Sequence, residues 1–334
     1  MTQPAIHARL YRGTPRNLVR LAHALQRGEL VGVPTETVYG LAANAFDARA
    51  CRRIFRAKGR PAADPLIVHI LALHDLARVA VPNEAALRLA RKFWPGPLTL
   101  VLPKKPAVPD VVTAGRPSVA VRMPRHSLFR RLLKLSGVPL AAPSANAFGY
   151  VSPTTAAHVR AGLGGKIPHI LDGGPAAIGL ESTIVDLRDP RKPRLLRPGA
   201  ITRAQLERAL RRPVPLAAAT RRASPGAQLA PGLLQRHYSP RTPLVLHSRI
   251  TAGDLRAAGS REAWLFVSRP RKVAGANIRW LDDRGTLRGA ARALFGQLRA
   301  LDAGGFEKIH VELAPGTGLA EAINDRLRRA AARR

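Results

Sequence analysis

The chain contains a single cysteine, Cys51, among its 334 residues, and this scarcity excludes several kinds of protein. One thiol forms neither an intramolecular disulfide nor a multi-cysteine metal site, and a chain without disulfides suits a reducing compartment. The sequence also lacks any run of about 18 apolar residues, the length needed to span a bilayer. The segment from Met1 to Arg20 lacks the regions of a signal peptide. We therefore expect a cytoplasmic protein that does not enter a membrane.

Aromatic and acidic residues are also few. Phe, Trp and Tyr make up 4% of the sequence, which argues against a base-stacking surface for nucleic acid. Lys and Arg outnumber Asp and Glu by 55 to 21, and the formal net charge is +34. Such a charge attracts polyanions, but a codon bias toward arginine and alanine would also produce it. The charge therefore leaves two interpretations open, nucleic-acid binding and background composition.

Four common catalytic motifs are absent as well. The sequence has no Gly-x-x-x-x-Gly-Lys-Ser/Thr loop, no Gly-x-Gly-x-x-Gly after a strand, no His-x-x-x-His pair and no Gly-x-Ser-x-Gly elbow. Nothing else in the sequence requires a covalent nucleophile. The polar residues that are present favour catalysis by positioning and charge stabilisation, as in phosphoryl and nucleotidyl transfer.

Helical and extended patterns alternate along the first two thirds of the chain. Amphipathic segments that follow a capping residue predict helices at residues 17–27, 47–58, 83–93 and 202–211. Short apolar runs bounded by Pro and Gly predict strands at residues 29–34, 65–70, 98–102, 118–123, 138–142, 167–171 and 183–187. This alternation predicts an α/β architecture, and Cys51 falls on the inner face of its helix.

A stretch rich in Pro, Ala, Gly and Arg interrupts this alternation and is typical of a linker. It covers residues 212–242 and ends in His237-Tyr-Ser-Pro. Beyond it we expect strands at residues 243–247, 263–268 and 308–313, and helices at 287–303 and 318–334. The sequence thus predicts a catalytic domain at 1–211, a linker, and a smaller Rossmann-like α/β domain at 243–334.

Polar side chains collect where predicted strands and helices end, a common location for functional groups in α/β proteins. Thr35 and Thr37 lie in a turn after the strand that stops at Pro34. Lys58 and Arg60 combine a point charge with a bidentate fork, which suits a polyphosphate. Each motif also has a purely structural explanation, since threonines stabilise their own turns and cations complement a helix C-terminus.

The same design recurs at later strand ends. Arg122 ends one predicted strand, and Ser144 with Asn146 follows the next. Ser152 precedes a proline, as in a helix N-cap whose backbone NH groups can receive an anion. Arg197 adds another fixed cation near the end of the first domain. Plain capping and a surface arginine are the alternatives for the last two residues.

Taken in order, these motifs resemble the YrdC-like family of L-threonylcarbamoyladenylate synthases. The matching blocks are Pro34-Thr-Glu-Thr-Val-Tyr-Gly, Lys58-Gly-Arg-Pro, Pro65-Leu-Ile-Val-His, Trp94-Pro-Gly-Pro-Leu-Thr, Val119-Ala-Val-Arg-Met-Pro, Ala142-Pro-Ser-Ala-Asn, Leu180-Glu-Ser-Thr and Leu196-Arg-Pro-Gly. The motif His237-Tyr-Ser-Pro and the domain after it resemble the long, two-domain form of the family, with a weaker match after residue 242.

The resemblance implies a twisted mixed sheet with flanking helices around a positively charged cleft, and a reaction in two stages. The amine of L-threonine captures bicarbonate to give a carbamate. A carbamate oxygen then attacks the α-phosphate of ATP, which releases pyrophosphate and leaves threonylcarbamoyl-AMP. Such a nucleotidyltransferase receives Mg2+ with ATP rather than on protein ligands. Its product serves the threonylcarbamoyl-adenosine modification of tRNA. The enzyme would meet tRNA directly or through a transferase complex.

The resemblance also implies roles for individual residues. The L-threonine pocket would be formed by Thr37, His69, Arg122, Ala142 and Ser182. The nucleotide would be bound by Arg60, Asp64, Ser118, Ser144, Ser152, Arg197 and Tyr238. Lys58 and Arg60 would face the phosphates as the catalytic residues. Because Tyr238 lies in the linker, the linker is expected to fold over the cleft as a lid.

Asp64 departs from the family, which often has asparagine at this position. A carboxylate beside ATP is unfavourable unless it meets Mg2+ or an arginine. Two other functions compete with the synthase. One is a nucleic-acid-binding module, supported by the net charge. The other is a carbamoyl-transfer domain of hydrogenase-maturation proteins, which carry cysteine-rich modules that a chain with one cysteine lacks.

Overall fold

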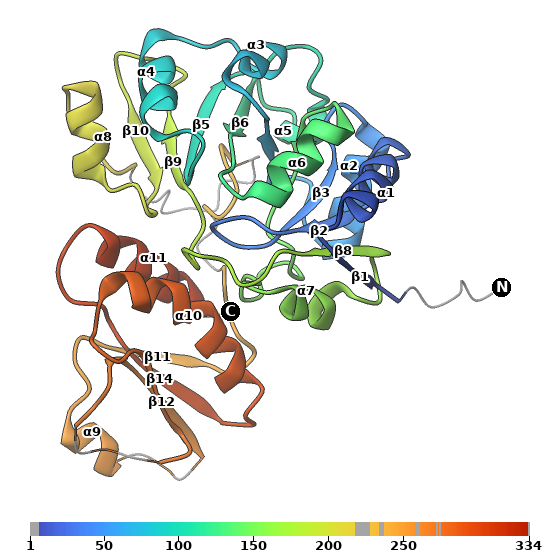
Figure 1. Ribbon diagram of the computed structural model, residues 1–334. Coiled ribbons are helices and arrows are strands. Elements are labelled where there is room, and N and C mark those ends of the chain that lie inside the picture. Colours follow the sequence, from blue (N-terminus) through green and yellow to red (C-terminus); the bar gives the residue numbers. More distant parts are fainter. Residues whose placement is uncertain are drawn as a thin grey trace.

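The computed structural model describes residues 7–217, 228–233, 237–257, 259, 261–271, 273 and 275–332. Within these residues lie a ten-stranded mixed sheet, built from residues 9–197, and a four-stranded parallel sheet, built from residues 244–312 (Figure 1). The α/β class predicted from the sequence is confirmed. No helix in the described part of the chain is both long enough and apolar enough to cross a lipid bilayer.

The larger sheet has the strand order β1-β8-β2-β3-β7-β4-β6-β5-β9-β10. Its strands are β1 (Arg9–Arg12), β2 (Val31–Val33), β3 (Gly40–Asn44), β4 (Ile67–His69), β5 (Leu98–Pro103), β6 (Ser118–Arg122), β7 (Leu140–Ala141), β8 (His169–Asp172), β9 (Thr183–Asp186) and β10 (Arg194–Arg197). β4 pairs parallel to β6 and antiparallel to β7, so the sheet is mixed at its centre. In this register His69 lies opposite Arg122, which brings two of the predicted site residues onto neighbouring strands.

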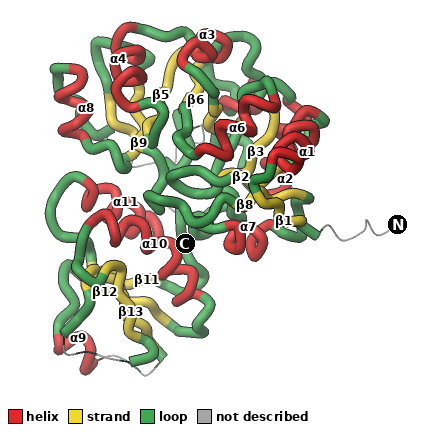
Figure 2. Tube along the Cα trace, in the orientation of Figure 1, coloured by secondary structure: helices red, strands yellow, loops and turns green. Residues whose placement is uncertain are grey.

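Helices flank this sheet, as the tube drawing shows (Figure 2). They are α1 (Pro15–Gln26), α2 (Ala48–Lys58), α3 (Leu76–Val79), α4 (Glu84–Phe93), α5 (Asp110–Thr113), α6 (Ser127–Ser136), α7 (Ala156–Leu163) and α8 (Arg203–Leu210), with a 3-10 turn at Leu73–Asp75. The side chains of Asp47, Asn83 and Thr202 cap α2, α4 and α8 as predicted. The first helix begins earlier than predicted, because Thr14 rather than Asn17 is its cap.

Apolar clusters fill the space between the sheet and these helices. Leu18, Leu21 and Leu25 of α1 pack against Phe129 and Leu132 of α6. Burial of such leucine and phenylalanine side chains contributes about 1.5–3 kcal/mol each.

Cys51 is fully buried in the core, as expected for a packing residue, and burial raises its pKa to about 12. Val214 belongs to the same core, and Leu216 bridges to Leu195 of β10. Packing against the larger sheet therefore continues past the end of α8.

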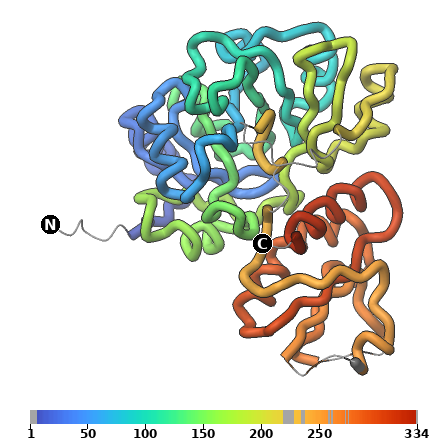
Figure 3. The backbone as a smooth tube through the Cα atoms, turned by 180° about the vertical axis from the view of Figure 1, so that it is seen from behind, coloured from blue at the N-terminus to red at the C-terminus, as the bar shows by residue number. Residues whose placement is uncertain are grey.

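The smaller sheet has the strand order β11-β14-β12-β13, with all pairs parallel. Its elements are β11 (Leu244–His247), α9 (Ala252–Ala257), β12 (Glu262–Ser268), β13 (Ile278–Asp282), α10 (Leu287–Asp302), β14 (Lys308–Glu312) and α11 (Leu319–Ala331). Helices α10 and α11 lie on the side of this sheet that faces the larger domain (Figures 1 and 3).

The two domains share a buried contact. Val151 and Leu180 of the larger domain belong to one apolar cluster with Leu294 and Phe295 of α10. Gly179 has a φ of +80°, and a Cβ added there would lie 2.5 Å from the carbonyl oxygen of Ala291. Glycine at this position thus permits the backbone of the larger domain to approach α10 closely.

Candidate functional site

A cavity opens between the strand ends of the larger sheet and the linker. Its lining residues are Thr35, Thr37, Val38, Tyr39, Gly40, Arg60, Ile67, His69, Arg122, Ala142, Pro143, Ser144, Glu181, Ser182, Arg197, Pro231, Gly232, His237 and Tyr238. They include three guanidinium groups and a single carboxylate among the residues described. This is the basic cleft that the sequence predicts.

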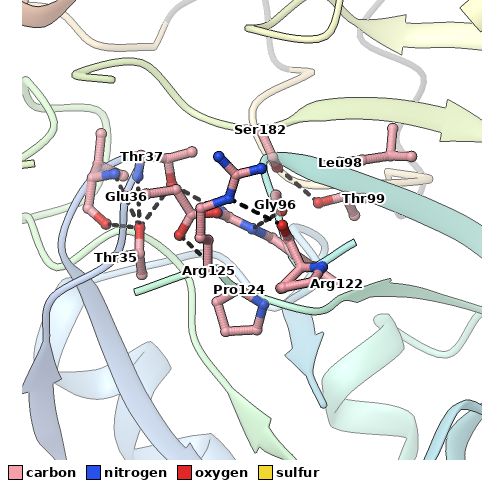
Figure 4. A network of polar contacts seen from close by, with 12 residues as sticks. Thr35, Glu36, Thr37, Gly96, Leu98, Thr99, Arg122, Pro124, Arg125 and Ser182 are labelled. Atoms are coloured by element: carbon pink, nitrogen blue, oxygen red, sulfur yellow. Dashed lines mark hydrogen bonds and ion pairs between the residues drawn. The ribbon is translucent and has the colours of Figure 1, made fainter. Parts of the chain in front are cut away.

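Arg122 lies at the end of β6 and is held by three neighbours (Figure 4). Its Nε donates to the carbonyl oxygen of Gly96 at 3.2 Å, and its Nη1 donates to Oγ1 of Thr37 at 2.9 Å. Its Nη2 forms an ion pair with Oε1 of Glu36 at 2.8 Å. A guanidinium has five N–H donors, so N–H groups on both Nη atoms remain for a carboxylate in the cavity.

Glu36 is the buried counter-charge of Arg122. Burial opposes its ionisation, but the charge and hydrogen bonding of Arg122 are decisive and lower the pKa of Glu36 below its ordinary value. Its Oε2 also accepts from the backbone N–H of Arg125 at 3.1 Å. Glu36 therefore fixes the orientation of Arg122 from behind and holds its guanidinium at the cavity wall.

The two threonines of this turn both line the cavity and share a hydrogen bond, with their Oγ1 atoms 2.8 Å apart, but they differ in their other partners. Thr35 Oγ1 donates to the carbonyl oxygen of Val38 at 2.6 Å and accepts from the backbone N–H groups of Thr37 and Val38. Thr35 thus stabilises its own turn, which is the structural explanation considered for this motif. Thr37 presents its hydroxyl to Arg122 and lines the cavity.

His69 supplies a neutral imidazole beside Arg122. It is 2% exposed, and burial, followed by the charge of Arg122, lowers its pKa to about 3. A ring that stays uncharged at neutral pH can accept a hydrogen bond from a substrate amine or hydroxyl, or donate one to a hydroxyl, and it adds no charge to the cavity. The ring lies 5.3 Å from that of Phe129, measured between centroids.

Ser182 connects the strand side of the cavity to the linker side. Its Oγ lies 2.7 Å from Oγ1 of Thr99, and it accepts from Nη2 of Arg197 at 3.1 Å. Arg197 also donates from Nη1 to the carbonyl oxygen of Pro231 in the linker, at 3.1 Å. A Cβ added at Gly232 would lie 2.6 Å from the hydroxyl oxygen of Tyr238 and 2.9 Å from Nη1 of Arg197. Glycine therefore allows the linker to enter the site.

Lys58, Arg60 and Asp64 form one buried cluster next to the cavity. Arg60 Nη2 pairs with Oδ2 of Asp64 at 2.9 Å, so the unusual carboxylate does meet an arginine. Lys58 donates from Nζ to the carbonyl oxygens of Ser144 and Asn146 at 2.6 and 2.5 Å. Burial, followed by the charge of Arg60, lowers the pKa of Lys58 well below its ordinary value. Only Arg60 of these three charged groups reaches the cavity wall.

The structure brings most of the predicted site residues together around this one cavity. Those that line it are Arg60, Thr37, His69, Arg122, Ala142, Ser182, Ser144, Arg197 and Tyr238. Behind the lining lie Lys58, Asp64 and Ser152, each in contact with a lining residue. Ser118, at the start of β6, is buried but does not line the cavity. Ser152 donates its hydroxyl to Glu181, whereas the hydroxyl of Ser118 has no partner among the described residues.

Among the lining residues that carry no role in the expectations drawn from the sequence are Glu181, Pro231, Gly232 and His237. Glu181 and His237 lie within sequence blocks that resemble the family, next to Ser182 and Tyr238, so these neighbours could have indicated that both residues lie at the site. Burial, followed by the charge of Arg60, lowers the pKa of His237 well below its ordinary value, so its ring is neutral. Pro231 and Gly232 lie in the linker, where composition alone does not single out a position.

Comparisons with known proteins agree with this geometry. The family model described as "Telomere recombination" (Sua5/YciO/YrdC) matches residues 23–199, and that described as "Threonylcarbamoyl-AMP synthase, C-terminal domain" matches residues 201–332. The threonylcarbamoyl-AMP synthase of Pyrococcus abyssi is 42% identical, over 92% of this chain and 91% of that protein. That of Bacillus subtilis is 41% identical, over 94% of this chain and 92% of that protein.

Solved structures show the same similarity. The crystal structure of Pyrococcus abyssi Sua5 complexed with L-threonine has a TM-score of 0.88 and 39% sequence identity, and it covers 98% of this chain and 97% of that one. A double alanine variant of the same protein has a TM-score of 0.86 and 37% identity. The similarity thus extends over both domains and the linker.

Proposed function

The chain belongs to the family of two-domain threonylcarbamoyl-AMP synthases, and from this premise we propose that it converts L-threonine, bicarbonate and ATP into threonylcarbamoyl-AMP, pyrophosphate and water. One observation carries the proposal. A single cavity places Arg122, with a neutral imidazole beside it, on the strand side, and Arg60 and Arg197 on the linker side. An amino acid and a triphosphate can therefore find separate counter-charges within one site.

We assign the L-threonine pocket to the strand side. The N–H groups that remain on Arg122 suit the amino-acid carboxylate, since a guanidinium binds such a group with two parallel hydrogen bonds. The hydroxyls of Thr37 and Ser182 and the neutral ring of His69 line the same side and can orient the ammonium and hydroxyl groups. The backbone near Ala142 completes this pocket.

We assign the nucleotide to the linker side. Arg60 and Arg197 lie there and can stabilise the negative charge of the phosphates. Ser144 adds a hydroxyl at the same wall. Lys58 acts from behind the lining, because its ammonium holds the carbonyl oxygens of Ser144 and Asn146 and so fixes the loop that presents Ser144.

The chemistry then follows from positioning. In the first stage the nitrogen of the neutral threonine amine bonds to the carbon of bicarbonate and gives up a proton, and the bicarbonate hydroxyl takes a proton and leaves as water. In the second stage a carbamate oxygen bonds to the α-phosphorus of ATP, and the bond from that phosphorus to the pyrophosphate oxygen breaks. The side chains hold both substrates in contact and neutralise charge as it develops, which are the main contributions expected for nucleotidyl transfer.

The linker serves as a lid over these reactants. Pro231, Gly232, His237 and Tyr238 line the cavity although they lie far in the sequence from its other walls. Figure 3 follows this segment into the larger domain, where Ala230 packs with Ile67 and Ile184. A lid excludes water, which protects a carbamate and an acyl adenylate from hydrolysis.

Mg2+ is proposed to enter with ATP. The carboxylates around the site are already neutralised by arginines: Glu36 by Arg122, Asp64 by Arg60 and Glu181 by Arg326. No group of three or more His, Cys, Asp or Glu side chains in the described residues is arranged to hold a metal ion. Bound with the phosphates, Mg2+ supplies charge neutralisation there, and the protein contributes the arginines around it.

We also propose that the product serves tRNA modification in the cytoplasm, through a threonylcarbamoyl transferase or on tRNA itself. The net charge of +34 is compatible with contact to tRNA. A module that only binds nucleic acid is not favoured, because its phosphate contacts would not require buried arginines inside a cavity.

The test is pyrophosphate release by the purified protein with ATP, Mg2+, bicarbonate and each amino acid in turn. The proposal predicts release with L-threonine that falls when bicarbonate is removed. Serine, which lacks the methyl group, and alanine, which also lacks the hydroxyl, are the matched controls and should be poorer substrates. Release that does not depend on threonine, or salt-sensitive tRNA binding without any turnover of ATP, would refute it.

A further inference from the structure

Arg326 of α11 is a buried arginine that reaches from the smaller domain to the wall of the cavity. Its side chain is 0% exposed, and its Nε lies 2.8 Å from Oε2 of Glu181, which lines the cavity. Its Nη1 lies 2.7 Å from Oδ2 of Asp325, the preceding residue. Arg326 itself does not line the cavity. A completely buried guanidinium at a domain boundary requires an explanation, because burying a charge is costly unless it is paired.

Arg326 also holds the tyrosine of the linker. The guanidinium carbon lies 5.3 Å from the centre of the Tyr238 ring, within the range of a cation–π contact. On α10 of the same domain, Phe295 stacks with Tyr238 at a centroid distance of 5.6 Å. The backbone N–H of His237 donates to the carbonyl oxygen of Arg329 at 3.3 Å. The end of the linker that enters the cavity is thus supported by two helices of the smaller domain.

We propose that Arg326 is a positioning residue for the nucleotide side of the cavity, and that through it the smaller domain sets the affinity for ATP. The assignment of Tyr238 to the nucleotide rests on the proposed function above. Arg326 acts on two groups of that side at once, Glu181 and Tyr238. The smaller domain is then part of the binding apparatus, although the described residues that line the cavity come from the larger domain and the linker.

The charge of Arg326 has a direct electrostatic consequence. Glu181 is the one carboxylate among the described lining residues, and an unpaired carboxylate there would repel the phosphates of ATP. Arg326 neutralises it. The other oxygen of Glu181 accepts the hydroxyl of Ser152, so the same carboxylate also orients a serine that we expect on the nucleotide side. Loss of Arg326 therefore weakens the site in two ways, through charge and through geometry.

The experiment compares Arg326→Met and Arg326→Lys with Arg328→Met in the full-length protein. Arg328 is exposed on the same helix, so its replacement removes an equal charge without touching the contact. Calorimetry measures the dissociation constants of ATP with Mg2+ and of L-threonine separately, and thermal unfolding verifies that each variant is folded. These binding constants do not depend on turnover. Absence of threonine-dependent pyrophosphate release from the wild type would count against the proposed function alone.

Arg326→Met is expected to weaken ATP binding by about tenfold or more, the effect of losing one charge-assisted contact, and to change threonine binding by less than about twofold. Arg326→Lys, which keeps the charge but not the planar fork, should fall between this variant and the wild type. If Arg326→Met does not fold, the lysine variant decides, with weaker ATP binding and unchanged threonine binding as the supporting result. ATP affinity equal to that of Arg328→Met, or equal losses for both ligands, would overturn the proposal.

Discussion

Replacing Arg122 should raise the threonine requirement far more than the ATP requirement, but the single variant has a second effect. Arg122 forms an ion pair with Glu36, and both side chains are buried. Removing one partner of a buried pair costs about 3–5 kcal/mol of folding stability, because the other charge is left uncompensated. Arg122→Met alone would therefore lose activity partly through unfolding.

A double variant separates the two effects. Arg122→Met with Glu36→Gln removes both charges and retains the approximate volume of both side chains. The threonine carboxylate then loses one charged partner, a loss of about 1.5–3 kcal/mol, which corresponds to about a 10- to 150-fold increase in KM. Glu36→Gln by itself keeps Arg122 and serves as the matched control. Its threonine KM should rise much less.

The assay is pyrophosphate release, with threonine varied at saturating ATP and then ATP varied at saturating threonine. Urea unfolding of each variant shows whether the double variant recovers stability relative to Arg122→Met. A folded double variant whose threonine KM equals that of the wild type would refute the assignment of Arg122. An equal rise in both KM values would refute the separation of the two sides of the cavity.

Three further predictions follow from the same contacts. Asp64→Asn should lower the KM for ATP, because Arg60 loses the carboxylate that neutralises it. The substitution leaves the hydrogen bonds from Arg60 to the backbone carbonyl oxygens of residues 64 and 65 in place. A higher KM in the pyrophosphate-release assay would contradict this. In the folded protein His69 has a pKa of about 3, whereas the ordinary value is 6.5. Between these pH values the unfolded chain binds a proton that the native state does not. The free energy of unfolding therefore falls as the pH decreases through this window. His69→Gln should reduce the pH slope of the free energy of urea unfolding there by up to about 1.4 kcal/mol per pH unit, and an unchanged slope would count against a neutral buried ring. Truncation after Ala217, which keeps the core residue Val214, should leave threonine binding intact and impair ATP binding, and calorimetry showing normal ATP affinity would contradict the lid.

Much of the fold could be predicted from local patterns. Helices α2, α4 and α8 follow side-chain caps and begin within one residue of the predicted positions. The strands predicted in the first domain are also present, with ends that differ by up to two residues. Apolar periodicity and capping act within a few residues, so one sequence is enough to read them.

The strands that were missed depend on pairing with other strands rather than on the preferences of their own residues. β3 consists of Gly, Leu, Ala and Asn, residues without strong strand preference, and it forms because it pairs with β2 and β7. β10 begins and ends with arginine, and its pairing with β9 determines its structure. Such pairing is a tertiary effect that outweighs local propensity.

For the site, the residue types could be predicted from the sequence and their roles from the resemblance, but which side chains reach the cavity could be seen only in the structure. Lys58 and Arg60 are two residues apart, yet only Arg60 reaches the cavity, because the ammonium of Lys58 is held by two carbonyl oxygens. The contact of Glu181 with Arg326 joins residues 145 positions apart. No local pattern indicates such a contact, and it is one of those that tie the smaller domain to the site.

Product analysis with carbon-13 bicarbonate shows whether the protein joins threonine, bicarbonate and AMP in one product. The purified protein is incubated with ATP, Mg2+, L-threonine and labelled bicarbonate, and the adenylate is examined by mass spectrometry. We expect threonylcarbamoyl-AMP that carries one labelled carbon, formed together with pyrophosphate, and no such product when threonine is omitted. An adenylate of threonine without the labelled carbon, or no adenylate at all from a folded protein, would contradict it.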